Sequence, residues 1–309
     1  MNPLPLISII IPAYNAQKTL SLTISSALRQ TYSNIEIIVV DDGSDISPEK
    51  IIDQFGDNRI SLFRIERTNA SNANVARNFG ISKSKGEYVA MLDADDRWLE
   101  NHLHDCLTLL QESGADGLYG SSFLTKTQSV EIDQLPVVHA RELKKGESMV
   151  DYLLSMGRGA QTPTLFTTAR SMKDILWDPD LIDHQDYDFV VRFYKKYKMT
   201  VKKEPTVIVS LSSGRASHYE TCIRFVEDNI KNIDPFVYVR YNFNMYKRTR
   251  MQKEYKFASY FQKEATRYKE YISYLQYISI CNPESRIREW VNKFKYIFYI
   301  LRMKTDVNS

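Results

Sequence analysis

The chain has 309 residues, 43% of them hydrophobic, and a formal net charge of +3. Its length suits one large domain, or one domain with an appendage, around an ordinary hydrophobic core. The low net charge gives no reason to expect a nucleic-acid partner. No apolar run reaches the roughly 18 residues of a membrane span, and no basic segment precedes residues 6–11 as it would in a signal peptide. The three cysteines form no CxxC pair, which indicates free thiols and a cytoplasmic location.

The positive charge is concentrated toward the C-terminus. Residues 225–309 contain 16 Lys and Arg against 9 Asp and Glu (+7), and the rest of the chain contains 25 against 29 (−4). Tyrosine is concentrated there as well. We therefore expect two parts: a domain at residues 1–220, and a helical, basic C-terminal region at residues 221–309, whose charge suits an anionic partner surface.

Four strands are predicted in the first third of the chain by apolar runs rich in β-branched residues, at residues 7–11, 35–40, 60–65 and 88–92. Stretches with helical spacing follow them, at residues 20–28, 48–55, 73–83 and 99–110. Asn15 is a candidate N-cap for the first helix. This alternation is typical of a parallel, doubly wound sheet with helices on both faces.

Beyond residue 119 the alternation weakens. Residues 121–134 are polar and indicate a loop or hairpin. Shorter patterns predict strands at residues 164–168 and 207–211 and a helix at residues 186–196.

Carboxylates follow two of the predicted strands. Asp41 and Asp42 end the second strand, and Asp93, Asp95 and Asp96 end the fourth. Parallel strands end at one rim of a sheet, where open α/β sheets bind ligands, so these groups should meet there. Such a concentration of negative charge is costly unless a cation neutralises it, and Mg²⁺ or Mn²⁺ binds carboxylates and bridges phosphates. The rim therefore predicts a site for a metal and a nucleotide diphosphate; a solvated acidic turn is the alternative.

Four stretches resemble, in order, the successive motifs of family 2 glycosyltransferases: IIIPAYN at 9–15, VVDDGS at 39–44, ARNFG at 76–80 and MLDADD at 91–96. The resemblance covers roughly residues 5–115, and it implies an α/β protein with the GT-A fold and an inverting mechanism. The C-terminal helical extension lies beyond it. No GxGxxG follows Ile11, which argues against a dinucleotide-dependent dehydrogenase.

The resemblance implies a role for each residue that matches a motif. Pro12, Tyr14 and Asn15 would line the nucleotide pocket. Asp42 would accept a hydrogen bond from the base, most often uracil, and Arg77 would contact the donor nucleotide. Only one aspartate of the pair needs to reach the base, so Asp41 is equally well explained as a turn or cap residue.

The same resemblance identifies Asp93-Ala94-Asp95 as the DxD motif. Asp95 would bind Mn²⁺ or Mg²⁺ together with Asp93, which would lie nearer the ribose. Asp96 is an alternative ligand, because family members differ in which carboxylate takes the metal. Residues 212–218 resemble the loop that closes over the diphosphate. Arg215 and Ser217 would then bind phosphate, and His218 would touch the metal or phosphate; a solvated loop is the alternative.

An inverting transfer also needs a general base near the acceptor hydroxyl. The family supplies it from a Glu-Asp pair that opens a helix, and here the matching residues are Gln185 and Asp186. Asp186 aligns with the base, although an ordinary helix N-cap would also suit Asp. The change of Glu to Gln185 favours the main rival hypothesis, a non-catalytic sugar-nucleotide-binding subunit of a polysaccharide-assembly complex. A nucleotidyltransferase lacks support because no Gly-rich phosphate loop follows Ile11.

Taken together, the resemblance implies a hexosyltransferase of cell-envelope polysaccharide synthesis. It would move a sugar from a UDP-sugar to a hydroxyl of a glycan or lipid-linked acceptor. Residues 288–304 have the pattern of a basic, aromatic amphipathic helix that lies on an anionic membrane surface, here the inner face of the membrane. Packing within the protein or in a homodimer is the alternative. Trp98 and Trp177 can stack on a sugar, although core packing is their more ordinary role.

Overall fold

The computed structural model describes residues 4–127, 131–156, 159–211 and 217–268. By its internal contacts the chain divides into two compact units, Met1–Ile230 and Lys231–Ser309. The predicted domains, a catalytic domain at 1–220 and a helical region at 221–309, are defined by their roles, which these contacts do not test, and they stay a prediction.

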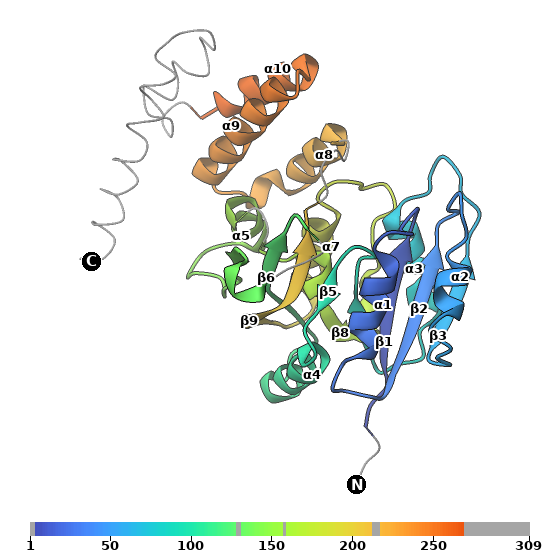
Figure 1. Cartoon of the computed structure of the whole chain (residues 1–309). Helices are drawn as coiled ribbons and strands as arrows, with labels where there is room; N and C mark the ends of the chain where they lie inside the picture. The colour runs from blue at the N-terminus through green and yellow to red at the C-terminus, as the bar shows by residue number, and fades with distance from the viewer. Residues whose placement is uncertain (1–3, 128–130, 157–158, 212–216, 269–309) are drawn as a thin grey trace. The chain divides into compact units, whose positions relative to one another are not determined.

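A nine-stranded sheet organises the described part of the first unit (Figure 1), with the order β3-β2-β1-β4-β8-β6-β9-β5 and β7 paired to β6. The strands are β1 (Ile7–Ala13), β2 (Ile35–Asp41), β3 (Ile60–Arg64), β4 (Tyr88–Met91), β5 (Arg97–Trp98), β6 (Gly117–Thr125), β7 (Val137–Val138), β8 (Phe166–Thr168) and β9 (Met199–Ser210). The α-helices of this unit are α1 (Leu20–Leu28), α2 (Glu49–Asp53), α3 (Ala73–Lys83), α4 (His102–Ser113), α5 (Met149–Met156), α6 (Ala169–Ile175), α7 (Gln185–Lys196) and α8 (Tyr219–Asn229). Two 3₁₀ turns, η1 (Ile132–Gln134) and η2 (Thr162–Thr164), connect them.

The two halves of the sheet differ in strand direction. Strands β3, β2, β1 and β4 are parallel. Strand β8 is antiparallel to both of its neighbours, β4 and β6, and β9 is parallel to β6 and antiparallel to β5. This arrangement confirms the predicted α/β fold class, with the parallel sheet in the first third of the chain.

Helices cover both faces of the parallel half. On one face, α1 and α4 share a hydrophobic core with alternate residues of β1 and β2. On the other face, α3 approaches so closely that a Cβ on Gly80 would lie 2.6 Å from Ile10 Cγ2. Because both faces are buried, these strands carry continuous apolar sequences, which is why they are recognisable.

Some local predictions need correction. Asn15 does not cap α1, which begins at Leu20 after Thr19; it has a positive φ of 49° and binds a neighbouring loop instead. The strand expected at 164–168 starts only at Phe166, because Thr162–Thr164 form a 3₁₀ turn with Pro163 at its start. The strand expected at 207–211 is the end of the much longer β9.

Both tryptophans near the acidic motifs are core residues. Trp98 is 3% exposed and donates its indole N–H to the Pro163 carbonyl at 2.9 Å. Trp177 is 2% exposed and stacks on Phe189 with the ring centroids 4.6 Å apart. Packing, the more ordinary of the two expected roles, is the one the structure shows.

The described part of the second unit contains two helices, α9 (Pro235–Met251) and α10 (Tyr255–Ala265). Asp234 caps α9, accepting hydrogen bonds from the N–H groups of Phe236 and Val237. The two helices pack together, and Tyr238 Oη donates to Glu264 Oε2 at 2.6 Å. Over the described stretches, no helix has both the length and the apolar character needed to cross a bilayer. The predicted amphipathic helix at 288–304 lies outside the described residues.

Candidate active site

The expected rim exists where β1, β2 and β4 end. Parallel pairing sets Ala13 opposite Asp41, and the Asp42 N–H donates to the Ala13 carbonyl at 2.8 Å. On the other side of β1, the Leu92 N–H donates to Ile10 O at 3.0 Å, so the acidic motif begins directly beside that strand. The structure therefore brings both acidic groups to one edge, as the sequence predicts.

The loop after β1 is joined to the loop after β2. The Asn15 N–H donates to Ser44 Oγ at 2.8 Å, and the Asn15 side chain exchanges two hydrogen bonds with Asp45. Tyr14 is 45% exposed, and the Arg67 guanidinium lies 3.6 Å from the centroid of its ring. Pro12 is buried within β1. An aromatic face and an amide thus flank the rim, although Pro12 lies beneath it.

The two aspartates that end β2 differ in their bonding. Asp41 Oδ1 accepts the Ser44 N–H at 3.0 Å, and its Oδ2 lies 3.3 Å from Arg64 Nη1. Asp42 Oδ2 lies 2.6 Å from Arg67 Nη1. Each aspartate also has one buried oxygen, Asp41 Oδ2 and Asp42 Oδ1, without a hydrogen-bond partner among the described residues. Burial raises the pKa of Asp42, and the side chains of Arg67 and Ser71 oppose that rise. Asp41 holds the turn through Ser44, and both aspartates offer a buried acceptor oxygen at the rim.

Gly43 makes the contact between Asp42 and Arg67 possible. Its φ is +67°, and a Cβ there would lie 2.6 Å from Arg67 Cβ. Only glycine adopts this conformation without strain and leaves room for the arginine.

Arg77 is a buried cation inside the site. It is 2% exposed, its Nη2 lies 2.6 Å from Asp93 Oδ1, and its Nη1 donates to Asn74 Oδ1 at 2.8 Å. The guanidinium also lies 4.7 Å from the centroid of the Trp177 ring. Its Nε is buried and has no hydrogen-bond partner among the described residues. The residue predicted to contact the donor thus also neutralises Asp93, the first carboxylate of the predicted DxD motif.

The three carboxylates after β4 form an electrostatic cluster. Asp96 is 3% exposed and accepts the Ser210 N–H at 2.7 Å, while Ser210 Oγ donates to the Asp95 carbonyl at 2.5 Å. Burial, followed by the charges of Asp95 and Asp93, holds the pKa of Asp96 well above its usual range. The end of β9 therefore fixes the acidic turn in place.

His218 does not complete a metal site with these aspartates. Across the residues that the structure covers, no three His, Cys, Asp or Glu side chains converge in a way that could hold a metal ion. The His218 N–H donates to Asp183 Oδ2 at 2.7 Å at the start of α8. Ser217 is half-buried beside it, and Arg215 lies outside the described residues.

Asp186 lies in the first turn of α7, next to this cluster. It does not cap the helix: the N-cap position is His184, which has a φ of 63°. Asp186 Oδ1 accepts the Tyr187 N–H at 3.0 Å. Although the residue keeps some exposure, burial of its carboxyl group raises its pKa to about 6; Tyr187 N–H and Arg77 oppose the rise, and Asp93 adds to it. The charges of Arg77 on α3 and of Asp93 after β4 therefore both act on this carboxyl group of α7.

Sequence reasoning missed three residues that organise this site, Arg67, Asn74 and Ser210. Arg67 follows β3 in a polar loop without a motif, and nothing in the sequence pairs it with Asp42. Asn74 lies inside the matched helix, and its Nδ2 donates to the carbonyls of Asp178 and Leu181, which join α3 to the segment before α7. Ser210 lies within the strand predicted at 207–211, one residue before its end, and that position was the only available signal.

Comparison with known proteins agrees with this geometry. The family model described as glycosyl transferase family 2 matches residues 8–168, just over half of the chain. The amylovoran biosynthesis glycosyltransferase AmsB of Erwinia amylovora is 32% identical over 60% of this chain and 62% of its own length. The UDP-Glc:alpha-D-GlcNAc-diphosphoundecaprenol beta-1,3-glucosyltransferase WfgD of Escherichia coli is 37% identical over 40% of this chain and 49% of its own length.

Solved structures show the same fold. TarS 1-349 of S. aureus, in complex with UDP-GlcNAc, has a TM-score of 0.60 at 19% identity, over 76% of this chain and 71% of that one. The matched stretches of AmsB and WfgD amount to 62% and 49% of those relatives, so the likeness concerns their shared part. On the combined evidence of family model, sequence relatives and fold, the chain belongs to glycosyltransferase family 2 and has the GT-A fold.

Proposed function

We propose that this protein is an inverting, metal-dependent glycosyltransferase that moves a sugar from a UDP-sugar to a hydroxyl of a glycan or lipid-linked acceptor. One observation carries the proposal: a buried, unpartnered acceptor atom on Asp42, a cluster of carboxylates and the pKa-shifted Asp186 lie around one rim. The base of a nucleotide needs a hydrogen-bond acceptor, a divalent metal needs carboxylate ligands, and the hydroxyl of an acceptor needs a base that takes its proton.

The donor nucleotide is held at the ends of β1 and β2. Asp42 Oδ1 accepts an N–H of the base, which removes the cost of a buried acceptor without a partner. Tyr14 and Asn15 flank the base and ribose. A uridine nucleotide is supported by relatives: WfgD takes UDP-Glc, and TarS has been crystallised with UDP-GlcNAc.

The acidic turn suits a hard divalent cation. Mg²⁺ and Mn²⁺ bind through one or two carboxylates and complete their coordination with substrate phosphates and water. Burial raises the pKa of Asp96 most, and the charges of Asp95 and Asp93 raise it further; a bound cation would relieve that repulsion. Asp95, with Asp93, would hold the ion, which when bound neutralises charge on the departing diphosphate.

Asp186 acts as the general base. With a pKa of about 6 it is mostly ionised at neutral pH, yet basic enough to accept a proton. It takes the proton of the acceptor hydroxyl, whose oxygen attacks the anomeric carbon. The bond from that carbon to the diphosphate breaks, and its electron pair leaves with UDP. Because the oxygen attacks in line, from the face opposite the diphosphate, the configuration inverts. Arg77 and Asp93 keep this end of the site in a fixed arrangement.

Calorimetric titration with nucleotides tests the donor site directly. We expect UDP to bind in the presence of Mn²⁺, and more weakly after chelation of the metal. Absence of binding by UDP and by the other nucleoside diphosphates would overturn the proposal. A screen of UDP-sugars for metal-dependent hydrolysis then identifies the sugar.

A lipid-linked acceptor would bring the protein to the inner face of the membrane, and WfgD acts on a diphosphoundecaprenol-linked sugar. The +7 charge of residues 225–309 supports this location, because each Lys or Arg near an anionic leaflet contributes roughly 1 kcal/mol. The full chain should sediment with anionic vesicles more than a chain ending at Asn282, and salt should weaken the attachment. Equal sedimentation would remove residues 283–309 from membrane binding and favour internal packing or a homodimer.

A further inference from the structure

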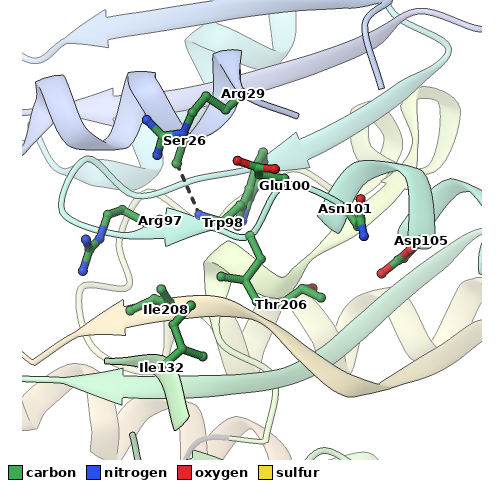
Figure 2. A pocket seen from close by; sticks show the side chains of 11 residues that line it. Ser26, Arg29, Arg97, Trp98, Glu100, Asn101, Asp105, Ile132, Thr206 and Ile208 are labelled. Atoms are coloured by element: carbon green, nitrogen blue, oxygen red, sulfur yellow. Dashed lines mark hydrogen bonds between the residues drawn. The ribbon is translucent and has the colours of Figure 1, made fainter. Parts of the chain in front are cut away.

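A pocket apart from the donor site lies on the face of the sheet that α1 and α4 cover. Its volume is about 520 Å³, within the range of small-molecule sites. The walls come from the end of α1, from β5 and the residues after it, from the first turn of α4, and from β9 (Figure 2). None of its lining residues belongs to the donor site described above.

Two arginines line this pocket. Arg97 Nη2 is buried and has no hydrogen-bond partner among the described residues. Arg29, at the end of α1, is exposed. Burial lowers the pKa of Arg97, the negative charge of Asp96 opposes that fall, and the positive charge of Arg29 adds to it. An anionic group in the pocket would give the buried Nη2 of Arg97 the hydrogen-bond partner that it lacks. Planar guanidinium groups bind phosphate oxygens in a bidentate manner, so a phosphoryl group suits this pair.

The opposite side of the pocket has a different character. Figure 2 shows Asn101 and Asp105 across the cavity from Arg97. Asp105 Oδ2 is 3.3 Å from Lys202 Nζ, while Glu100 is exposed. Carboxylate and amide oxygens accept hydrogen bonds from hydroxyls and repel a second negative charge. A ligand that is anionic at one end and hydroxylated at the other fits both sides.

We propose that this pocket binds a small phosphate monoester, with its phosphoryl group between Arg29 and Arg97 and its hydroxyl groups toward Glu100 and Asn101. Sugar phosphates and glycerol phosphate have this chemistry. A lipid headgroup that ends in a phosphate monoester shares it. Arg97 directly follows the acidic turn of the donor site, although none of the carboxylates of that turn lines the pocket.

Binding measurements on the full chain test the proposal. The probes are a hexose 1-phosphate, glycerol 3-phosphate, inorganic phosphate and vesicles containing phosphatidic acid, each with and without UDP. We expect binding of the soluble esters that UDP does not displace, and tighter binding of the hexose phosphate than of inorganic phosphate. Binding of the vesicles alone would identify the headgroup as the source of the phosphoryl group.

Matched variants locate the site. Arg29→Gln and Arg97→Gln should each weaken binding roughly tenfold or more, the loss expected for a charged hydrogen bond. Arg170→Gln, which removes an exposed arginine on α6, should leave binding unchanged. Because Arg29 is exposed, its variant should fold normally, and thermal unfolding checks this. Displacement by UDP, equal binding by Arg29→Gln and the wild type, or no binding of any probe would overturn the proposal.

Discussion

The carboxylates at the ends of the parallel strands and the carboxylate on α7 lie in different electrostatic surroundings. Asp42 and Asp93 each lie 2.6 Å from an arginine nitrogen, whereas Asp186 accepts its hydrogen bond from the backbone N–H of Tyr187. Burial raises the pKa of Asp42, and the directly paired Arg67 opposes that rise. Burial of the Asp186 carboxyl group is the main cause that raises its pKa to about 6, and the Tyr187 N–H and the charge of Arg77 oppose the rise only in part. The parallel half is suited to hold a ligand by fixed charges, and α7 is suited to exchange a proton.

Removal of the proposed base is expected to have the largest effect. Asp186→Asn keeps the size of the side chain but cannot take a proton, so kcat should fall roughly 10²- to 10⁴-fold. UDP binding should stay unchanged, because the donor contacts lie on β1, β2 and β4. Asp188→Asn is the matched control on the same helix, where the carboxylate binds Arg192. Full activity of Asp186→Asn would overturn the assignment of Asp186 as the general base.

Asp42→Asn should weaken UDP binding by roughly 10- to 100-fold, the range for loss of one charged hydrogen bond. The amide has a single acceptor oxygen, which cannot serve both Arg67 and the base. Calorimetry with UDP measures the change. Asp57→Asn removes a carboxylate that is likewise paired to an arginine, at 2.8 Å from Arg59, and should leave affinity unaltered. Equal affinities of the two variants would show that Asp42 only holds Arg67.

The variant Asp186→Asn should also be more stable than the wild type above about pH 6. Since the folded pKa is raised from 3.8 to about 6, charging this carboxyl costs folding energy. The cost is absent below about pH 4, grows as pH rises to about 6, and is constant above it, at about 1–3 kcal/mol. Denaturant unfolding at about pH 8 and pH 5 measures it. A gain that is equal at both pH values would point to a cause other than ionisation.

The smallest expected effect is a displacement of the pH profile. In the wild type, kcat/KM should rise as pH passes through about 6 and then level off, because only ionised Asp186 accepts a proton. Arg77 lowers the pKa of Asp186, so Arg77→Gln should move the rise to higher pH. The ratio of rates at two pH values in the same variant measures this independently of any loss of folded protein. An unshifted profile would show that Arg77 does not influence the pKa of the group that accepts the proton.

The parallel half was largely predictable because its information is local. Strands buried on both faces need uninterrupted apolar runs, and short crossovers leave little choice of topology. The helix predicted at 73–83 is α3, with Asn72 as its cap. The acidic groups met at one rim for the same reason, since parallel strands end on the same side. The family motifs lie in this half, so they identified its fold.

Beyond β4 the sequence was less informative because the pairing is long-range. Strand β8 has three residues and inserts between β4 and β6, with partners about 50 to 80 positions away in the chain. Such a strand is too short to show a period, and its place depends on what it packs against. The extent of β9 was missed because its first half alternates weakly and is specified by its parallel pairing with β6.

The sequence by itself determined the order of the elements, the rim on which carboxylates collect and the residue types available there. Tertiary structure alone decided which groups pair: Arg67 with Asp42 and Arg77 with Asp93 as ion pairs, and Ser210 with the acidic turn through a hydrogen bond. It also decided that Asp186 is enclosed enough to have a pKa of about 6. Hydrophobic periodicity is a property of neighbouring residues, whereas a pKa depends on burial and on charges from distant segments, and only the folded chain brings these together.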